Sequence, residues 1–132
     1  MAFPLAPSYK PRRAVAELEC RAMTGAERLD AFALYRSTIH DEAALGAALA
    51  LFAEREDLGM VWLALEDGHA IAACTVSYEI GIVHGAIVAR IAHVVVAQSH
   101  DRHTVARHLL ETLRDTLNTR GITEFAAEDA FG

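Results

Sequence analysis

Hydrophobic positions recur along the first half of the chain in two periods, which predict one strand followed by two helices. The run "AVAELECRAM", residues 14–23, predicts the strand. Thr24 and Glu27 then have the spacing of a capping box, and hydrophobic residues at helical spacing continue to about His40. The run "DEAALGAALALFAERED" predicts a second helix with one apolar stripe, which Asp41 can cap.

The second half of the chain predicts three antiparallel strands, a helix and a last strand. Two strand-like runs in "MVWLALEDGHAIAACTVSYEI" flank Asp67-Gly68, a dipeptide typical of tight hairpin turns. A turn at residues 81–85 precedes "AIVARIAHVVVA", residues 86–97, whose apolar end is typical of a strand covered on both faces. Helical spacing continues over residues 104–119, and "ITEFAAEDAFG" predicts a short strand and a tail.

This order of elements, β-α-α-β-β-β-α-β, predicts an α/β fold of the α+β kind, in which helices flank a mixed, mostly antiparallel sheet. The chain has 132 residues, of which 53% are hydrophobic, so we expect a single packed domain over residues 14–132. Residues 1–13 contain three prolines and are interpreted as an extended arm.

Charge and cysteine content narrow the classes of function. The net charge of -6 is not typical of a nucleic-acid-binding protein, and no segment resembles a signal peptide or a membrane span. Cys20 and Cys74 lie in apolar runs without CxxC spacing, which indicates buried, reduced thiols. We therefore expect a cytoplasmic protein with neither a nucleic-acid nor a membrane partner.

Basic residues gather where the last long helix is expected to begin. The stretch "AHVVVAQSHDRHTVARHLL", residues 92–110, contains two arginines and four histidines. A helix N-terminus carries partial positive charge, so added cations are unfavourable there unless an anion is present. The anion could belong to a ligand, or it could be the carboxylate of Asp101 acting as the N-cap.

The same stretch resembles the signature of the GNAT N-acetyltransferase superfamily. In that family a strand ending in aliphatic residues leads through a short loop to Arg/Gln-x-x-Gly-x-Gly/Ala, which opens a helix carrying a Leu-Leu pair. Here "VVV" (94–96), "DRHTVA" (101–106) and "LL" (109–110) fall in that register. Asp101 and Thr104 depart from the pattern, whereas Ala106 fits it. The order of elements extends the resemblance over about residues 14 to 128.

The resemblance implies acetyl-CoA, or another acyl-CoA, as the co-substrate. Its pyrophosphate would lie on backbone N–H groups at the start of the helix, which is ordinary anion binding at a helix N-terminus. Its pantetheine arm would pair with the end of the preceding strand. The implied cofactor-binding residues are therefore Val94, Val95, Val96, Arg102, His103, Thr104, Val105, Ala106 and Arg107.

Two residues are candidates for the general base that removes a proton from the attacking amine. His93 lies where some relatives have a carboxylate near the end of this strand, and an imidazole is a credible substitute. Glu79, near the end of the preceding strand, is the second candidate. The alternatives are a histidine satisfied within the sheet and a surface carboxylate.

A metal site is the other chemistry that this region could support. His93, His100, Asp101, His103 and His108 lie close together in the sequence. However, His103 and His108 are five residues apart and would point to different helix faces, and no cysteine joins them. We therefore expect no metal.

The sequence supports an acyl-CoA-dependent N-acetyltransferase whose acceptor is an unidentified amine on a small molecule or a protein. The alternative is a catalytically inactive GNAT-like module that binds a CoA-type ligand or a protein partner. It is favoured by Asp101, by Thr104 and by the lack, after Phe125, of the tyrosine that often acts as general acid in the family. A short last strand would leave a sheet edge open, so we also expect a homodimer.

Overall fold

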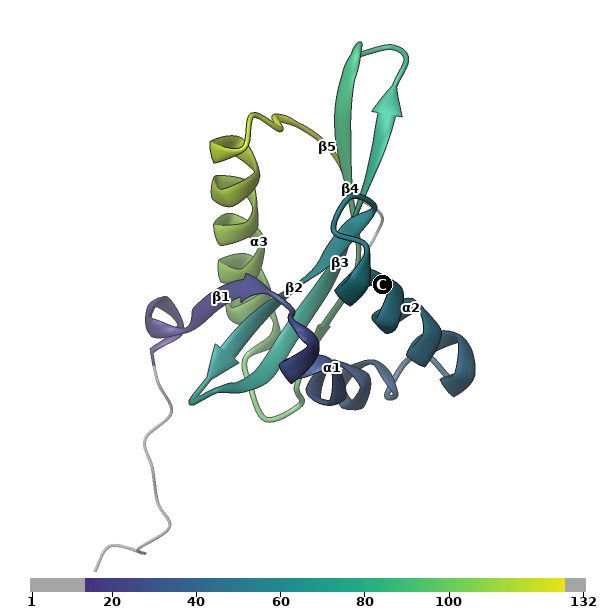
Figure 1. Cartoon of the computed structure of the whole chain (residues 1–132). Coiled ribbons are helices and arrows are strands. Elements are labelled where there is room, and N and C mark those ends of the chain that lie inside the picture. Colours follow the sequence, from purple (N-terminus) through teal and green to yellow (C-terminus); the bar gives the residue numbers. More distant parts are fainter. Residues whose placement is uncertain (1–13, 128–132) are drawn as a thin grey trace, which may run out of the picture.

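The computed structural model describes residues 14–127, which form one five-stranded sheet with helices on both faces (Figure 1). The strands lie side by side in the order β1-β2-β3-β4-β5. The first four pair antiparallel, and β5 pairs parallel to β4. Their bounds are β1 Glu19–Ala22, β2 Gly59–Glu66, β3 His69–Gly81, β4 Ala86–Val96 and β5 Glu124–Ala127.

The helices divide between the two faces of the sheet and create two hydrophobic cores. Helices α1 (Arg28–Tyr35) and α2 (Glu42–Glu54) cover one face, and α3 (Arg102–Thr119) covers the other. Strand β2 contributes to both cores, because Trp62 faces α3 while Leu63 faces α1 and α2. The α3 core includes four α3 residues at i, i+4 spacing, Val105, Leu109, Leu113 and Leu117.

The predicted fold class and order of elements are confirmed, and the differences are local. The strand predicted at residues 14–23 is shorter, because β1 pairs only with residues 62–65 of β2. A 3-10 turn, Val15–Glu17, precedes it. The helix predicted to reach His40 ends at Tyr35, where the hydroxyls of Ser37 and Thr38 donate to backbone carbonyls of the last turn.

The cap predicted for the second helix is present, and the last helix has a C-terminal cap as well. Asp41 accepts a hydrogen bond from the backbone N–H of Ala44 at the start of α2. After α3, Gly121 has φ +83°, and the N–H of Ile122 bonds to the carbonyl of Leu117, as in a Schellman motif. These local signals fix where the helices begin and end.

The two cysteines differ in environment. Cys74 is buried, and burial raises the pKa of its thiol to about 12. Cys20 is only half-buried, so the expectation of two buried thiols is wrong for this residue, because β1 is an edge strand of the sheet. Both thiols are free.

The two ends of the chain and the question of a membrane span complete the description. The proposed arm at residues 1–13 lies outside the described residues, as does the tail after residue 127. Within residues 14–127, no helix is long and apolar enough to cross a membrane.

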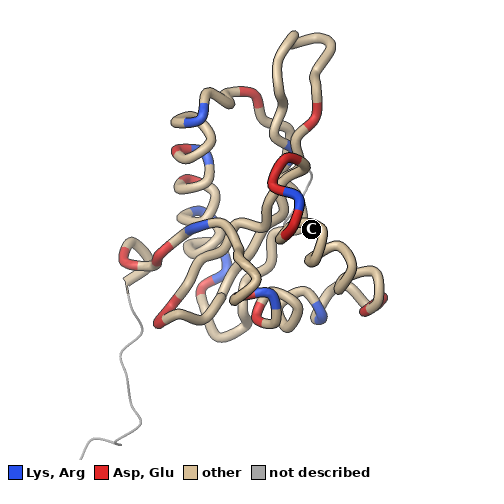
Figure 2. The backbone as a smooth tube through the Cα atoms, viewed as in Figure 1, with Lys and Arg blue, Asp and Glu red and all other residues tan. Residues whose placement is uncertain are grey.

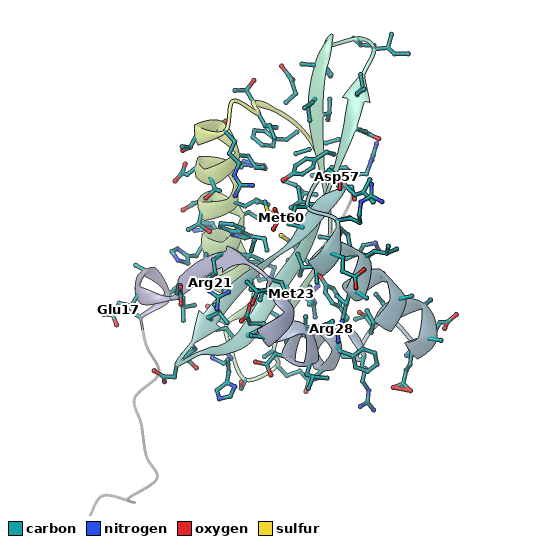
Figure 3. All side chains as sticks on the ribbon, in the orientation of Figure 1. Glu17, Arg21, Met23, Arg28, Asp57 and Met60 are labelled. Carbon is teal, nitrogen blue, oxygen red and sulfur yellow. The ribbon has the colours of Figure 1, made fainter. Side chains whose placement is uncertain are left out.

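The capping box at Thr24 is reinforced by an ion pair from the neighbouring strand. The Glu27 carboxylate accepts from the Thr24 backbone N–H at 2.8 Å and from the Arg21 guanidinium at 2.8 Å. Figure 3 labels Arg21, which lies on β1. The bond from Arg21 is the main reason that the pKa of Glu27 falls to about 2. Glu27 is buried, so this group ties β1 to the start of α1.

Replacing Glu27 with Gln is expected to lower the free energy of unfolding by about 2 kcal/mol near neutral pH. The folded-state pKa lies below the ordinary value of 4.5, so the wild type holds its advantage above pH 4.5. It loses that advantage as the pH falls from 4.5 towards 2. Urea unfolding of both proteins over a series of acidic pH values measures the difference.

The matched control is the exposed Glu56, which lies in the turn before β2. Glu56→Gln is expected to change stability by less than about 0.5 kcal/mol at any pH. A wild-type advantage over Glu27→Gln that stays constant down to about pH 3 would contradict this account.

Candidate active site

His93 is an extra residue in β4 and creates a bulge. Pairing with β3 shifts between Ala73↔Val95 and Thr75↔Ala92, so two residues of β4, 93 and 94, face one residue of β3. His93 has φ +53°, a left-handed conformation that few non-glycine residues adopt and that stores strain. The bulge leaves the His93 side chain exposed.

The bulge also exchanges the faces of the strand. Before it, Ala89 and Ile91 belong to the core beneath α3, so a regular strand would place Val95 there. After it, Val94 belongs to that core and Val95 belongs to the core beneath α1 and α2. The expectation that the end of this strand is covered on both faces is confirmed, since Val94 and Val95 are buried in different cores and Val96 packs against the α3 core.

Among the described residues, one edge of β4 has no strand partner beyond the bulge. Strand β5 pairs only with residues 88–91, and β3 lies on the opposite side of β4. Within residues 14–127, no strand pairs with residues 92–96 on the β5 side. Here the Tyr35 hydroxyl, buried at the end of α1, donates to the His93 carbonyl at 2.8 Å. Burial raises the pKa of Tyr35 well above its usual value, so the hydroxyl stays protonated.

A cavity of about 360 Å³ lies beside the bulge, between α2 and the sheet. His93 and Ala92 contribute from β4, and most of the remaining wall is aliphatic or aromatic. The full lining is Tyr35, Ile39, Ala44, Leu45, Ala48, Leu49, Phe52, Thr75, Ser77, Arg90, Ala92 and His93. Apolar pockets with a few polar groups are typical of small-molecule sites.

The second predicted base, Glu79, does not line this cavity. Its carboxylate accepts from the Arg90 guanidinium at 2.7 Å, and Arg90 does line the cavity. The structure therefore places His93 in the cavity wall and connects Glu79 to it only through Arg90.

A second cavity, of about 210 Å³, brings together two parts of the predicted cofactor site. Val94, Val95 and Val96 at the end of β4 line it together with Arg102 at the start of α3. Its other lining residues are Ser37, Thr38 and Gln98.

The remaining predicted cofactor residues lie elsewhere on α3. His103 and Arg107 line a separate hollow of about 330 Å³ along the helix, together with Leu110, Glu111 and Arg114. The side chains of Val105 and Ala106 are buried in the core, so only their backbone could contact a ligand. Thr104 is exposed and belongs to the helix cap.

Asp101 caps α3 with its own carboxylate. One oxygen accepts from the Thr104 backbone N–H at 3.3 Å, and the other accepts from the Thr104 hydroxyl at 2.8 Å. The hydroxyl bond is the main reason that the pKa of Asp101 is lowered. Asp101 is thus the N-cap of α3, and any further anion at this helix start must lie beside its carboxylate.

The loop before α3 is attached to the far end of β2, a connection with no sequence signal. The His100 ring contacts a Glu66 carboxylate oxygen at 3.1 Å, and the Ser99 hydroxyl lies 2.9 Å from the other ring nitrogen. The second oxygen of Glu66 is buried without a hydrogen-bond partner. This contact fixes the loop that leads from the end of β4 to the start of α3.

The clustered histidines do not converge. His100 contacts Glu66, and the His108 ring lies 3.3 Å from the Leu18 carbonyl oxygen. Within the described residues, no three His, Cys, Asp or Glu side chains lie close enough to hold a metal ion.

The chain belongs to the acetyltransferase (GNAT) family, whose model matches residues 14–130. Among curated proteins, no sequence matches the chain significantly.

Solved structures with a similar fold include several acetyltransferases. The aminoglycoside N-acetyltransferase AAC(6')-Iy in complex with CoA has a TM-score of 0.74 and 20% identity, over 96% of this chain and 82% of that chain. The aminoglycoside 6'-N-acetyltransferase AAC(6')-IG from Acinetobacter haemolyticus has a TM-score of 0.70 and 23% identity, over 85% of this chain and 79% of that chain. Ribosomal-protein-alanine N-acetyltransferase from Brucella melitensis biovar Abortus 2308 has a TM-score of 0.69 and 15% identity, over 84% of this chain and 79% of that chain.

Proposed function

We propose that this chain is an N-acetyltransferase that transfers the acetyl group of acetyl-CoA to an amine. The observation that carries the proposal is the bulge at His93, which lies between two cavities where β4 has no strand partner on its β5 side among residues 14–127. Membership of the GNAT family supports the choice of reaction. The free cysteines are compatible with a cytoplasmic location.

The cavity formed by the end of β4 and Arg102 fits the CoA arm. Backbone groups on the β5 side of residues 92–96 have no strand partner among residues 14–127, so they are suited to bond an amide-bearing chain. Arg102 lies at the start of α3, where a guanidinium can bind phosphate oxygens. His103 and Arg107 offer further basic contacts along α3.

The transfer itself needs a neutral amine beside the thioester. The amine nitrogen attacks the thioester carbonyl carbon, the C–S bond breaks, and CoA leaves as the thiol after taking up a proton. His93 accepts the proton that the amine loses, directly or through a water molecule. We rank Glu79 second as a base, because Arg90 already binds its carboxylate and it does not line the cavity.

The alternative function, an inactive module, is favoured by one observation. The Asp101 carboxylate already accepts the Thr104 N–H at the start of α3, and its charge would repel a diphosphate. The question is therefore whether the basic residues around it still hold CoA.

Calorimetric titration of the chain with CoA is expected to give saturable, salt-sensitive binding. Asp101→Asn should tighten it about 3- to 10-fold, because asparagine caps a helix as well as aspartate but removes the negative charge. Asp115→Asn, at an exposed position of the same helix, is the control for net charge and should leave the affinity unchanged. If Asp101→Asn and Asp115→Asn change the affinity for CoA equally, the proposed position of the anion is contradicted. If CoA binds to Asp101→Asn but not to the wild type, the inactive module is favoured.

Replacing His93 with Asn is expected to lower the rate of acetyl transfer roughly 100-fold without weakening CoA binding. Asparagine tolerates the left-handed backbone but cannot accept the proton, so the fold is preserved while the base is lost. Steady-state kinetics and calorimetry measure the two effects separately. An unchanged rate would remove His93 from the mechanism.

We also propose that two copies associate through the β3–β4 hairpin. Figure 1 shows this hairpin extending beyond the helices and the rest of the sheet. Its tip is apolar, and Ile82 and Val83 are 95% and 92% exposed, with Ile80 and Ile87 beside them. Exposed apolar clusters of this kind mark interaction surfaces.

The double substitution Ile82→Ser with Val83→Ser is expected to convert dimers to monomers, because it removes the apolar tip. Light scattering at several protein concentrations measures the molar mass. Leu29→Ser removes a side chain on α1 that is 83% exposed, away from the hairpin, and should leave dimers intact. A monomeric wild type would contradict this interface. So would an equal loss of dimers in the double variant and in Leu29→Ser.

A further inference from the structure

We propose that the acceptor is a primary amine on an apolar body that carries no second positive charge. This inference rests on the proposed acetyl transfer and concerns the cavity beside His93. It is drawn from three properties of that cavity: its apolar wall, its charges and the position of His93.

The wall opposite the sheet is built from apolar side chains. Helix α2 contributes Leu45, Ala48, Leu49 and Phe52, and Ile39 adds to them from the segment before α2. Burying an apolar body against this wall removes apolar surface from water, at about 25 cal/mol per Å². The volume of about 360 Å³ lies within the range of small-molecule sites.

The charges of the cavity disfavour a polycation. Arg90 is charged, and none of the lining residues is an aspartate or a glutamate. Helix α2 has acidic residues only at its two ends, Glu42 and Glu54, and Figure 2 shows its middle without charge. Glu79, the carboxylate bound to Arg90, is outside the lining.

A substrate with several ammonium groups would have to lose water without gaining a carboxylate partner. That is costly, because a buried charge needs a paired, hydrogen-bonded partner. Polyamines and aminoglycosides are therefore poor candidates for this cavity. Several structures of similar fold are aminoglycoside acetyltransferases, so this chain is expected to differ from them in its acceptor.

The polar groups of the cavity lie on the sheet side, where the amine would react. His93 lines the cavity from the bulge, and Ser77 lines it from β3. The Thr75 hydroxyl already donates to the Ala92 carbonyl at 3.1 Å. An acceptor would therefore place its amine at the sheet and its apolar body along α2.

The test is calorimetric titration of the whole chain with 4-phenylbutylamine, spermidine and kanamycin, without acetyl-CoA. We expect saturable binding of 4-phenylbutylamine and at least 10-fold weaker binding of the two polycations. Tighter binding of spermidine or kanamycin would overturn the proposal, as would no binding of 4-phenylbutylamine at millimolar concentration.

Two neighbouring alanines of α2 provide matched variants. Ala48 lines the cavity and Ala47 does not, and both are exposed. Ala48→Phe should fill the cavity and weaken 4-phenylbutylamine binding at least 10-fold, whereas Ala47→Phe should not. Ala48→Asp should shift the preference toward spermidine, because it adds the missing carboxylate, and Ala47→Asp should leave the preference unchanged. Equal effects at the two positions would overturn the assignment of the cavity.

The outcome is separable from that of the proposed function. Acetyl transfer to spermidine or kanamycin but not to 4-phenylbutylamine would contradict the proposed class of acceptor and support the proposed reaction. Binding of 4-phenylbutylamine without CoA binding or acetyl transfer would overturn the reaction and leave an apolar amine site.

Discussion

The bulge at His93 is the constraint on which the rest of the site depends. It moves the side chains after it by one position, so that Val94 packs beneath α3 and Val95 beneath α1 and α2. Its backbone is strained, with φ +53°, and the Tyr35 hydroxyl binds its carbonyl. This one irregular residue lines the cavity beside α2, and the valines that follow it line the second cavity.

The start of α3 combines two opposing electrostatic demands. The helix needs a cap, and Asp101 supplies it with a carboxylate. A CoA diphosphate needs positive charge and N–H groups at the same place, which Arg102 and the neighbouring basic side chains can supply in part. Asp101 caps the helix where Arg102, His103 and Arg107 add positive charge, so the proposed binding of CoA depends on which charge prevails.

The two sides of the bulge differ in chemistry. On the α3 side, Arg102 and the end of β4 line the cavity in which we propose that the anionic, amide-bearing CoA arm binds. On the α2 side, the wall is apolar and the lining lacks a carboxylate. His93 lines the apolar cavity and the valines that follow it line the other, so in the proposed transfer the amine acceptor and the acyl donor would approach from the two sides of the bulge.

The sequence by itself determined the order of elements, the helix caps and the position of α3, because periodicity and capping depend on residues a few positions apart. It also placed His93 and the end of β4 in the candidate site. Only the tertiary structure decided the strain at His93, the bond from Tyr35 and the exclusion of Glu79 from the cavity wall. The same holds for the contact between His100 and Glu66. These depend on strand register and on contacts between distant residues, which packing establishes and local patterns do not encode.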